Sequence, residues 1–119
     1  MKPKIKIKRV YEEPSKTDGA RILVDRLWPR GMKKATADIQ EWAKELAPTA
    51  ALRTWFGHDP ERWTEFQRKY RAELKKNPAV AAFITAHKDT KVITLVYGAK
   101  DETHNQALVL QEFLEHLYL

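Results

Sequence analysis

The sequence predicts an α/β fold, with one small domain over residues 1–119 and a mostly parallel sheet of three to four strands flanked by helices. Short runs rich in β-branched residues at 22–24 and 92–96 are typical of strands that are covered on both faces. A long stretch with helical spacing of apolar residues separates them, and such a crossover joins parallel strands. A chain of 119 residues is long enough for one hydrophobic core and too short for two.

Residues 2–8 form the first predicted strand, because lysines alternate there with apolar residues. A period of two gives a strand one lysine face and one apolar face. Lysines on an edge strand discourage pairing between sheets, so we expect this strand at the edge. A row of lysines that binds phosphate groups is the alternative interpretation.

Residues 21–27 form the second predicted strand, and its apolar centre at 22–24 favours a central position in the sheet. Pro29 biases the preceding residue toward an extended conformation, and Gly31 permits a sharp turn. The end of this strand therefore carries a loop with polar and aromatic side chains, which are Asp25, Arg26, Trp28 and Arg30.

The long crossover is predicted to hold helices over about residues 39–46, 49–57, 59–76 and 77–87. Thr49, Asp59 and Asn77 are expected caps, and proline follows the last two at the first helical position. Aromatic residues that recur with helical spacing are normally buried, so we expect core positions for Trp42, Trp63, Phe66, Tyr70 and Phe83.

Residues 91–119 read as a buried strand, a polar loop and an amphipathic closing helix. Thr103 is the expected N-cap of this helix, with Gln106 closing a capping box, and Asp101 is the competing cap. A strand end followed by a loop and a helix N-terminus is the usual place for anion binding or chemistry in an open α/β sheet.

Parallel neighbouring strands end at the same edge of a sheet, so we expect loops 25–31 and 97–105 to lie side by side. Arginine offers paired donors to phosphate or carboxylate, and histidine can transfer a proton near neutral pH. In this hypothesis Arg26 and Arg30 bind the anion, and Lys100 adds charge. Asp101 and His104 orient or transfer protons. The remaining candidates in these loops are Trp28, Tyr97 and Asn105. The alternative is structural, with an arginine paired to a carboxylate, Asp101 as a cap and Trp28 as a lid on the core.

A second group of candidates lies between two predicted helices. His58 precedes the Asp59 cap, and Arg53 lies on the short helix before it. If this loop faces the same edge of the sheet, Arg53 reaches the site, and His58 and His104 can act as an acid–base pair. A loop histidine that serves only the local structure is the alternative.

The composition narrows the classes of function. A net charge of +6 is compatible with a polyanionic partner, although 16 acidic residues are interspersed among the 22 basic ones. The chain has no cysteine, which excludes disulfides, thiolate metal sites and a cysteine nucleophile. The four histidines lack close ligand spacing, so we predict no metal and no cofactor. No apolar run approaches the ~20 residues of a membrane span, and we expect a cytoplasmic protein with no membrane contact.

Three separated motifs resemble one known family: DRLWPRG at 25–31, LRTWFGHDPERW at 52–63 and TLVYGAKDETHNQA at 94–107. Together they resemble the domain-of-unknown-function family 488, and more narrowly its short YeaO-like branch, over nearly the whole chain. The resemblance implies a small cytoplasmic α/β protein from a family with no firmly established reaction. Longer relatives carry cysteines around the last-strand loop, where this sequence has Tyr97 and His104, so thiol chemistry does not carry over. Some members are labelled transcriptional regulators, but the sheet-centred pattern offers no helix-turn-helix.

We therefore expect a monomer or weak dimer that binds a small anionic ligand, bearing phosphate or carboxylate, at the C-terminal edge of the sheet. The sequence leaves open whether acid–base catalysis follows. The rival prediction is a basic nucleic-acid-associated or regulatory DNA-binding module, which would use the lysines of residues 2–8 and the arginine-rich loop.

Overall fold

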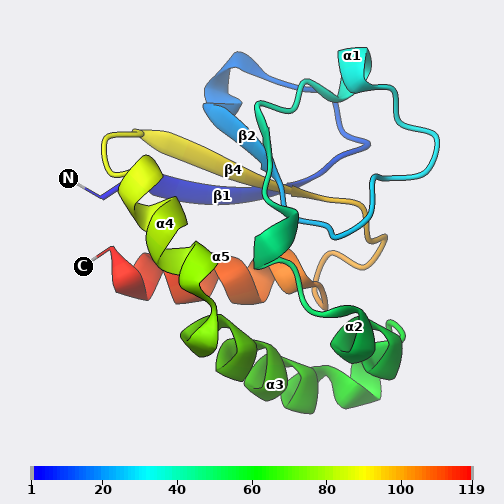
Figure 1. Cartoon of the computed structure of the whole chain (residues 1–119). Helices are drawn as coiled ribbons and strands as arrows, with labels where there is room; N and C mark the ends of the chain where they lie inside the picture. Colours follow the sequence, from blue (N-terminus) through cyan, green and yellow to red (C-terminus); the bar gives the residue numbers. More distant parts are fainter. Residues whose placement is uncertain (1, 119) are drawn as a thin grey trace.

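The computed structural model describes residues 2–118 and is built on one sheet of parallel strands (Figure 1). The strand order is β1-β4-β2-β3, and every neighbouring pair runs in parallel. This arrangement confirms the predicted α/β class, with a sheet that is parallel throughout. The strands are β1 (Lys4–Arg9), β2 (Ala20–Leu23), β3 (Glu41–Trp42) and β4 (Val92–Tyr97).

Strand β1 is an edge strand, as its lysines predict, and it pairs only with β4. Ile5 is buried on the apolar face, whereas two of the lysines bond to the segment that follows β1. Lys6 Nζ donates to the backbone oxygen of Thr17 at 2.7 Å, and Lys8 Nζ lies 3.2 Å from the Asp18 carboxylate. The inner lysines of the strand are therefore part of the fold.

Helices cover the sheet unequally (Figure 1). The two longest, α3 and α5, lie below the sheet in this view, and the short α1 lies above it. The α-helices are α1 (Lys34–Ala37), α2 (Ala50–Phe56), α3 (Trp63–Lys76), α4 (Pro78–Ala86) and α5 (Gln106–Leu117). Single turns of 3₁₀ helix are η1 (Lys16–Asp18), η2 (Lys44–Leu46) and η3 (Pro60–Arg62). Among residues 2–118, none of the helices combines the length and the apolar character needed to cross a membrane.

The main hydrophobic core lies between the sheet and helices α2 to α5. Alternate residues of the central strands, such as Ile22 and Leu95, are fully buried in it against Leu110 and Leu114 of α5. A smaller cluster on the other face joins Val96 to Val10 and Ala37. Period-two alternation in the strands thus divides the apolar side chains between a large core and a small one.

Local signals set the helix ends largely as predicted. Thr49, Asp59 and Asn77 each accept a backbone N–H at the start of a helix. The predicted cap of the last helix, Thr103, is wrong. Asn105 is the N-cap of α5, and its Oδ1 accepts the N–H of Leu108 at 3.1 Å.

The predicted helix over residues 39–46 is wrong. Asp38 has a left-handed backbone, with φ of 52°, and ends α1 after a single turn. The chain then turns onto the sheet, where the N–H groups of Gln40 and Ala43 donate to carbonyl oxygens of β2 at 2.9 and 2.8 Å. These bonds form β3 in place of a helix, because an open strand edge offers the backbone partners that a short helix would supply itself.

Most of the aromatic residues predicted to be core are buried. Phe66, Tyr70 and Phe83 are buried, and Trp63 packs on the core partly exposed. Trp42 was predicted wrongly, since 37% of its surface is exposed. Its place on the edge strand β3 accounts for this, because an edge strand is not enclosed by neighbours.

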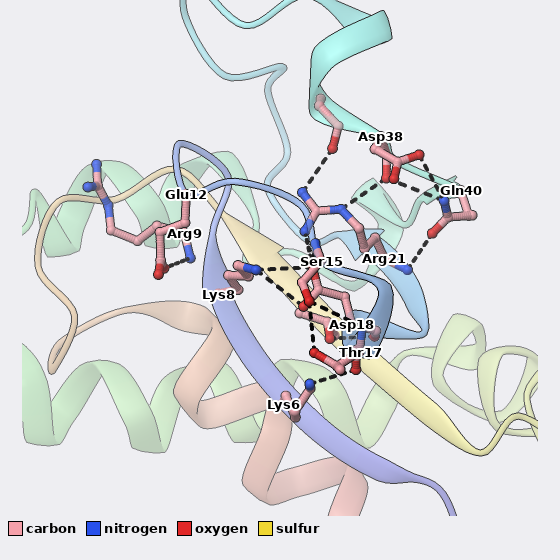
Figure 2. A network of polar contacts seen from close by, with 12 residues as sticks. Lys6, Lys8, Arg9, Glu12, Ser15, Thr17, Asp18, Arg21, Asp38 and Gln40 are labelled. Carbon is pink, nitrogen blue, oxygen red and sulfur yellow. Dashed lines mark hydrogen bonds and ion pairs between the residues drawn. The ribbon is translucent and has the colours of Figure 1, made fainter.

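A buried ion-pair network holds the start of β2 (Figure 2). Arg21 is 1% exposed, and its Nη1 lies 2.7 Å from the Asp18 carboxylate, which Lys8 also contacts. The other guanidinium N–H groups donate to the carbonyl oxygens of Ala37 and Asp38. Burial raises the pKa of Asp18, but a backbone hydrogen bond and the contacts with Arg21 and Lys8 outweigh it, so the pKa lies below its usual value. The network ties β2 to η1 and to the segment before β3.

Candidate functional site

The ends of β2 and β4 meet at the carboxyl edge of the sheet, as predicted from the parallel topology. The Asp25 carboxylate, just past β2, accepts the backbone N–H of Gly98, just past β4, at 2.9 Å. A cleft of about 260 Å³ opens beside this contact. Its walls come from the loop after β2, from α2 and the loop after it, and from the segment between β4 and α5.

The three sequence motifs therefore converge on one cleft. Most of the site residues predicted from them line it, namely Arg26, Trp28, Arg30, Arg53, His58 and His104. The only carboxylate among the lining residues is Asp25. A cleft with three arginines, two histidines and one carboxylate favours a negatively charged ligand.

Asp25 is held at the edge of the cleft by two hydrogen bonds. Its Oδ2 accepts from Gly98, and its Oδ1 accepts from the side-chain amide of Gln106. It forms no ion pair within residues 2–118. Burial raises the pKa of Asp25 to about 6, although these hydrogen bonds and the positive charges of Arg53 and His58 lower it in part.

Arg26 and Arg53 differ in how many of their guanidinium nitrogens donate hydrogen bonds within the protein. Arg26 donates from Nε to the carbonyl oxygen of Pro48 at 2.9 Å and from Nη2 to that of Ala47 at 3.1 Å. Its Nη1 has no hydrogen-bond partner in the described part of the chain, and neither has any guanidinium nitrogen of Arg53. Arg26 thus fixes the cleft wall, and Arg53 keeps its donors for a ligand.

His104 is oriented by the loop that precedes α5. Its Nδ1 lies 2.9 Å from Oδ2 of Asp101, and its ring packs edge-on against Trp63 at 5.4 Å. A backbone hydrogen bond from Thr103 is the main cause that lowers the pKa of Asp101 to about 2, so the carboxylate accepts and Nδ1 carries the proton. Nε2 of His104 is left as the ring atom for a ligand or a proton.

His58 contributes a polar side chain to the lining of the cleft, and Trp28 contributes an apolar one. His58 is exposed and has a left-handed backbone, with φ of 56°, an uncommon conformation that aims its side chain from the end of α2. Trp28 donates its indole N–H to the carbonyl oxygen of Met32 at 2.7 Å and packs edge-on against Trp42. Its ring therefore presents apolar surface to the cleft.

The other predicted site residues lie outside the cleft. Tyr97 is buried in the core, and burial raises its pKa. Asn105 is 1% exposed and caps α5, while Lys100 is exposed and does not line the cleft. Asp101 stands behind His104 and acts through it.

Sequence reasoning missed the central role of Asp25 and the participation of Gln106. Asp25 was assigned to the loop, but nothing in the sequence alone showed that its carboxylate would bond across to Gly98. An aspartate that directly follows a buried parallel strand was the available signal. In the part of the chain that is described, no three His, Asp or Glu side chains are grouped to hold a metal ion.

Comparisons with known proteins place this chain among relatives with the same overall extent. Residues 4–119 match a family described as the inactive DUF488-N3 subclade. The uncharacterized protein YeaO of Escherichia coli is 41% identical over 113 residues, which cover 95% of this chain and 98% of YeaO. The uncharacterized protein Rv3073c of Mycobacterium tuberculosis is 36% identical over 111 residues, 93% of each chain, and Mb3100c of Mycobacterium bovis gives the same values. No solved structure shows a significant match.

Proposed function

Since the chain belongs to the inactive DUF488-N3 subclade, we propose that it is a cytoplasmic protein that binds a small anionic ligand without transforming it. The ligand bears a phosphate or carboxylate group and occupies the cleft at the carboxyl edge of the sheet. The description of the subclade as inactive supports binding over catalysis.

The observation that carries this proposal is that Arg53 and Arg26 line one cleft and that, within residues 2–118, the Arg53 guanidinium and Nη1 of Arg26 have no hydrogen-bond partner. Planar guanidinium groups match the paired oxygens of phosphate and carboxylate. A guanidinium that already had a carboxylate partner would gain little from an anion, and neither arginine forms an ion pair within residues 2–118.

The histidines that line the cleft add hydrogen-bonding groups for the same anionic ligand. Nδ1 of His104 is held by Asp101, and the residue lines the cleft with no hydrogen bond to Nε2 from residues 2–118. A protonated imidazole donates to an anion, and a neutral one accepts from a ligand hydroxyl. Proton transfer would need the same arrangement of His104 and Asp101. The proposal nevertheless predicts binding without turnover.

The rival nucleic-acid function gains less support. Lys6 and Lys8, which it would use, are bonded to Thr17 and Asp18. Lysines with partners in the fold release fewer counterions when they meet a phosphate backbone.

Calorimetric titration with inorganic phosphate in about 150 mM salt tests the proposal, since that salt screens weak surface attraction. We expect saturable binding at one site, weakened about tenfold or more in Arg53→Gln through the lost charge-assisted hydrogen bonds. Lys88→Gln removes the same charge from an exposed position outside the cleft and should leave the affinity unchanged. Absence of saturable binding, or equal losses in both variants, would overturn the proposal.

A further inference from the structure

We propose that the ligand of this cleft carries a hydroxyl group beside its anionic group, and that the Asp25 carboxylate accepts a hydrogen bond from that hydroxyl. The ligand class is a small hydroxylated anion, such as a polyol or sugar phosphate. This inference rests on the proposed function, because it concerns a second recognition group of the same cleft.

The first observation is the position of a carboxylate in a site that otherwise favours anions. Asp25 is the only acidic residue among the lining residues, and it repels the group that the arginines attract. A site for a bare anion would be stronger without it. A ligand that also presents a hydrogen-bond donor gives the carboxylate a favourable role in recognition.

The second observation is the unused accepting capacity of Asp25. Each carboxylate oxygen can accept about two hydrogen bonds. The protein supplies one donor to each, the Gly98 N–H to Oδ2 and the Gln106 amide to Oδ1. These two contacts hold the group in one orientation, and a lone pair on each oxygen remains for the cleft that Asp25 lines.

The charge of the cleft selects a hydroxyl over an ammonium group as that donor. Arg53 and His58 act electrostatically on Asp25, and Arg26 and Arg30 line the same space. A cationic ligand group would be repelled by these side chains, whereas a neutral hydroxyl is not. A hydroxyl also donates to a carboxylate in a short, strong hydrogen bond.

The size and the apolar wall agree with this class. A cleft of about 260 Å³ lies just below the usual range of about 300–1,000 Å³ for ligand pockets, so it admits one small molecule. Leu27, Trp28, Pro29 and Phe56 supply apolar lining. Because the Trp28 N–H is bonded to Met32, the ring offers only apolar surface, which suits the C–H face of a polyol.

The test compares two probes that share charge and chain length, glycerol 3-phosphate and propyl phosphate. Calorimetry at about pH 7.5 keeps Asp25 ionised, since its pKa is about 6. We expect wild type to bind glycerol 3-phosphate about tenfold more tightly, the usual value of a hydrogen bond to a charged group. In Asp25→Asn this preference should fall to about threefold or less, while propyl phosphate binds more tightly because a repelling charge is gone.

The outcomes separate this inference from the proposed function. If neither phosphate binds, the proposed function fails and this inference fails with it. If both bind with equal affinity to wild type, the cleft binds anions and the hydroxyl inference is wrong. If the preference survives in Asp25→Asn, the hydroxyl is recognised elsewhere and the assignment to Asp25 is overturned. A variant that merely loses its fold would weaken both probes, which is distinct from the tighter binding of propyl phosphate that we expect.

Discussion

Asp25 Oδ2 accepts the backbone N–H of Gly98 at 2.9 Å, across 73 positions of sequence. This hydrogen bond joins the ends of two parallel strands, β2 and β4, where the cleft begins. The same carboxylate crowds the space that a side chain at position 98 would need. A Cβ at this position would lie 2.9 Å from the carboxylate oxygen.

Substitution of Gly98 by alanine should therefore displace the Asp25 carboxylate rather than unfold the chain. The overpacking is confined to a side-chain oxygen and Pro29, so we expect a stability loss of about 1–2 kcal/mol. Affinity for glycerol 3-phosphate, measured by calorimetry, should fall about tenfold with the misplaced acceptor. Unchanged affinity would show that the carboxylate position does not matter to the ligand.

Replacement of Asp25 by asparagine should stabilise the fold at neutral pH. Folding raises the pKa of this carboxyl from 3.8 to about 6, so the folded state favours the protonated form. Below the unfolded pKa, Asp25 does not reduce the free energy of unfolding. Above pH 6 the ionised carboxylate reduces it by the full amount, about 3 kcal/mol for a two-unit shift in pKa. Urea unfolding from about pH 4 to about pH 7 should show the variant gaining on wild type as pH rises. The exposed Asp89→Asn is the control, and a gap that does not change with pH would refute the prediction.

Gly19→Ala should be far more damaging than Gly31→Ala. Both glycines have positive φ, 64° and 76°, so alanine is strained at either site by about 1–2 kcal/mol. Only at Gly19 would the Cβ also collide, 2.4 Å from the backbone oxygen of Val92. We expect an additional loss of about 1–3 kcal/mol in chemical denaturation. Equal losses in the two variants would contradict the packing of Gly19 against β4.

Arg21→Met should destabilise the fold by about 3–5 kcal/mol, because it removes a buried guanidinium that pairs with a buried carboxylate. The Asp18 carboxylate loses its ion pair with Arg21 (Figure 2), and the carbonyl oxygens of Ala37 and Asp38 each lose a donor. Arg68→Met breaks an exposed pair with Glu65 and should change the urea midpoint little. A stable Arg21→Met variant would mean that the network in Figure 2 contributes little.

The contribution of Asp18 should also depend on pH, in the opposite sense to Asp25. Folding lowers its pKa below 3.8, so its stabilising effect is present above that pH and is lost as pH falls. Asp18→Asn should therefore be destabilised at neutral pH, and its deficit should shrink in acid unfolding experiments. A deficit of the same size at both pH values would contradict the ionic role of Asp18.

Local signals explain which parts of the fold were predictable. Asp59 and Asn77, each followed by proline, mark helix starts through chemistry that operates within a few residues. The helix prediction for residues 39–46 was wrong because their apolar spacing fits a helix, whereas pairing with β2 determined the structure that forms. Such pairing depends on a strand some twenty positions away, which periodicity does not report.

The candidate site was predictable to the level of loops but not of contacts. Parallel topology correctly placed the loops of Arg26 and His104 at one edge. It could not reveal that Arg26 donates a hydrogen bond to the carbonyl oxygen of Pro48, or that Asn105 caps α5. These roles are set by backbone groups that are distant in sequence or by the register of a helix start, which shifts by a residue or two.

The most direct test of anion binding in the cleft is an NMR titration with inorganic phosphate in about 150 mM salt, with duplex DNA added separately. The proposal predicts saturable phosphate-induced shifts confined to amides in 26–30, 53–58 and 98–106 and to the Trp28 indole N–H. Shifts centred on residues 2–8 with DNA, fading as salt rises, together with no saturable response to phosphate, would contradict it.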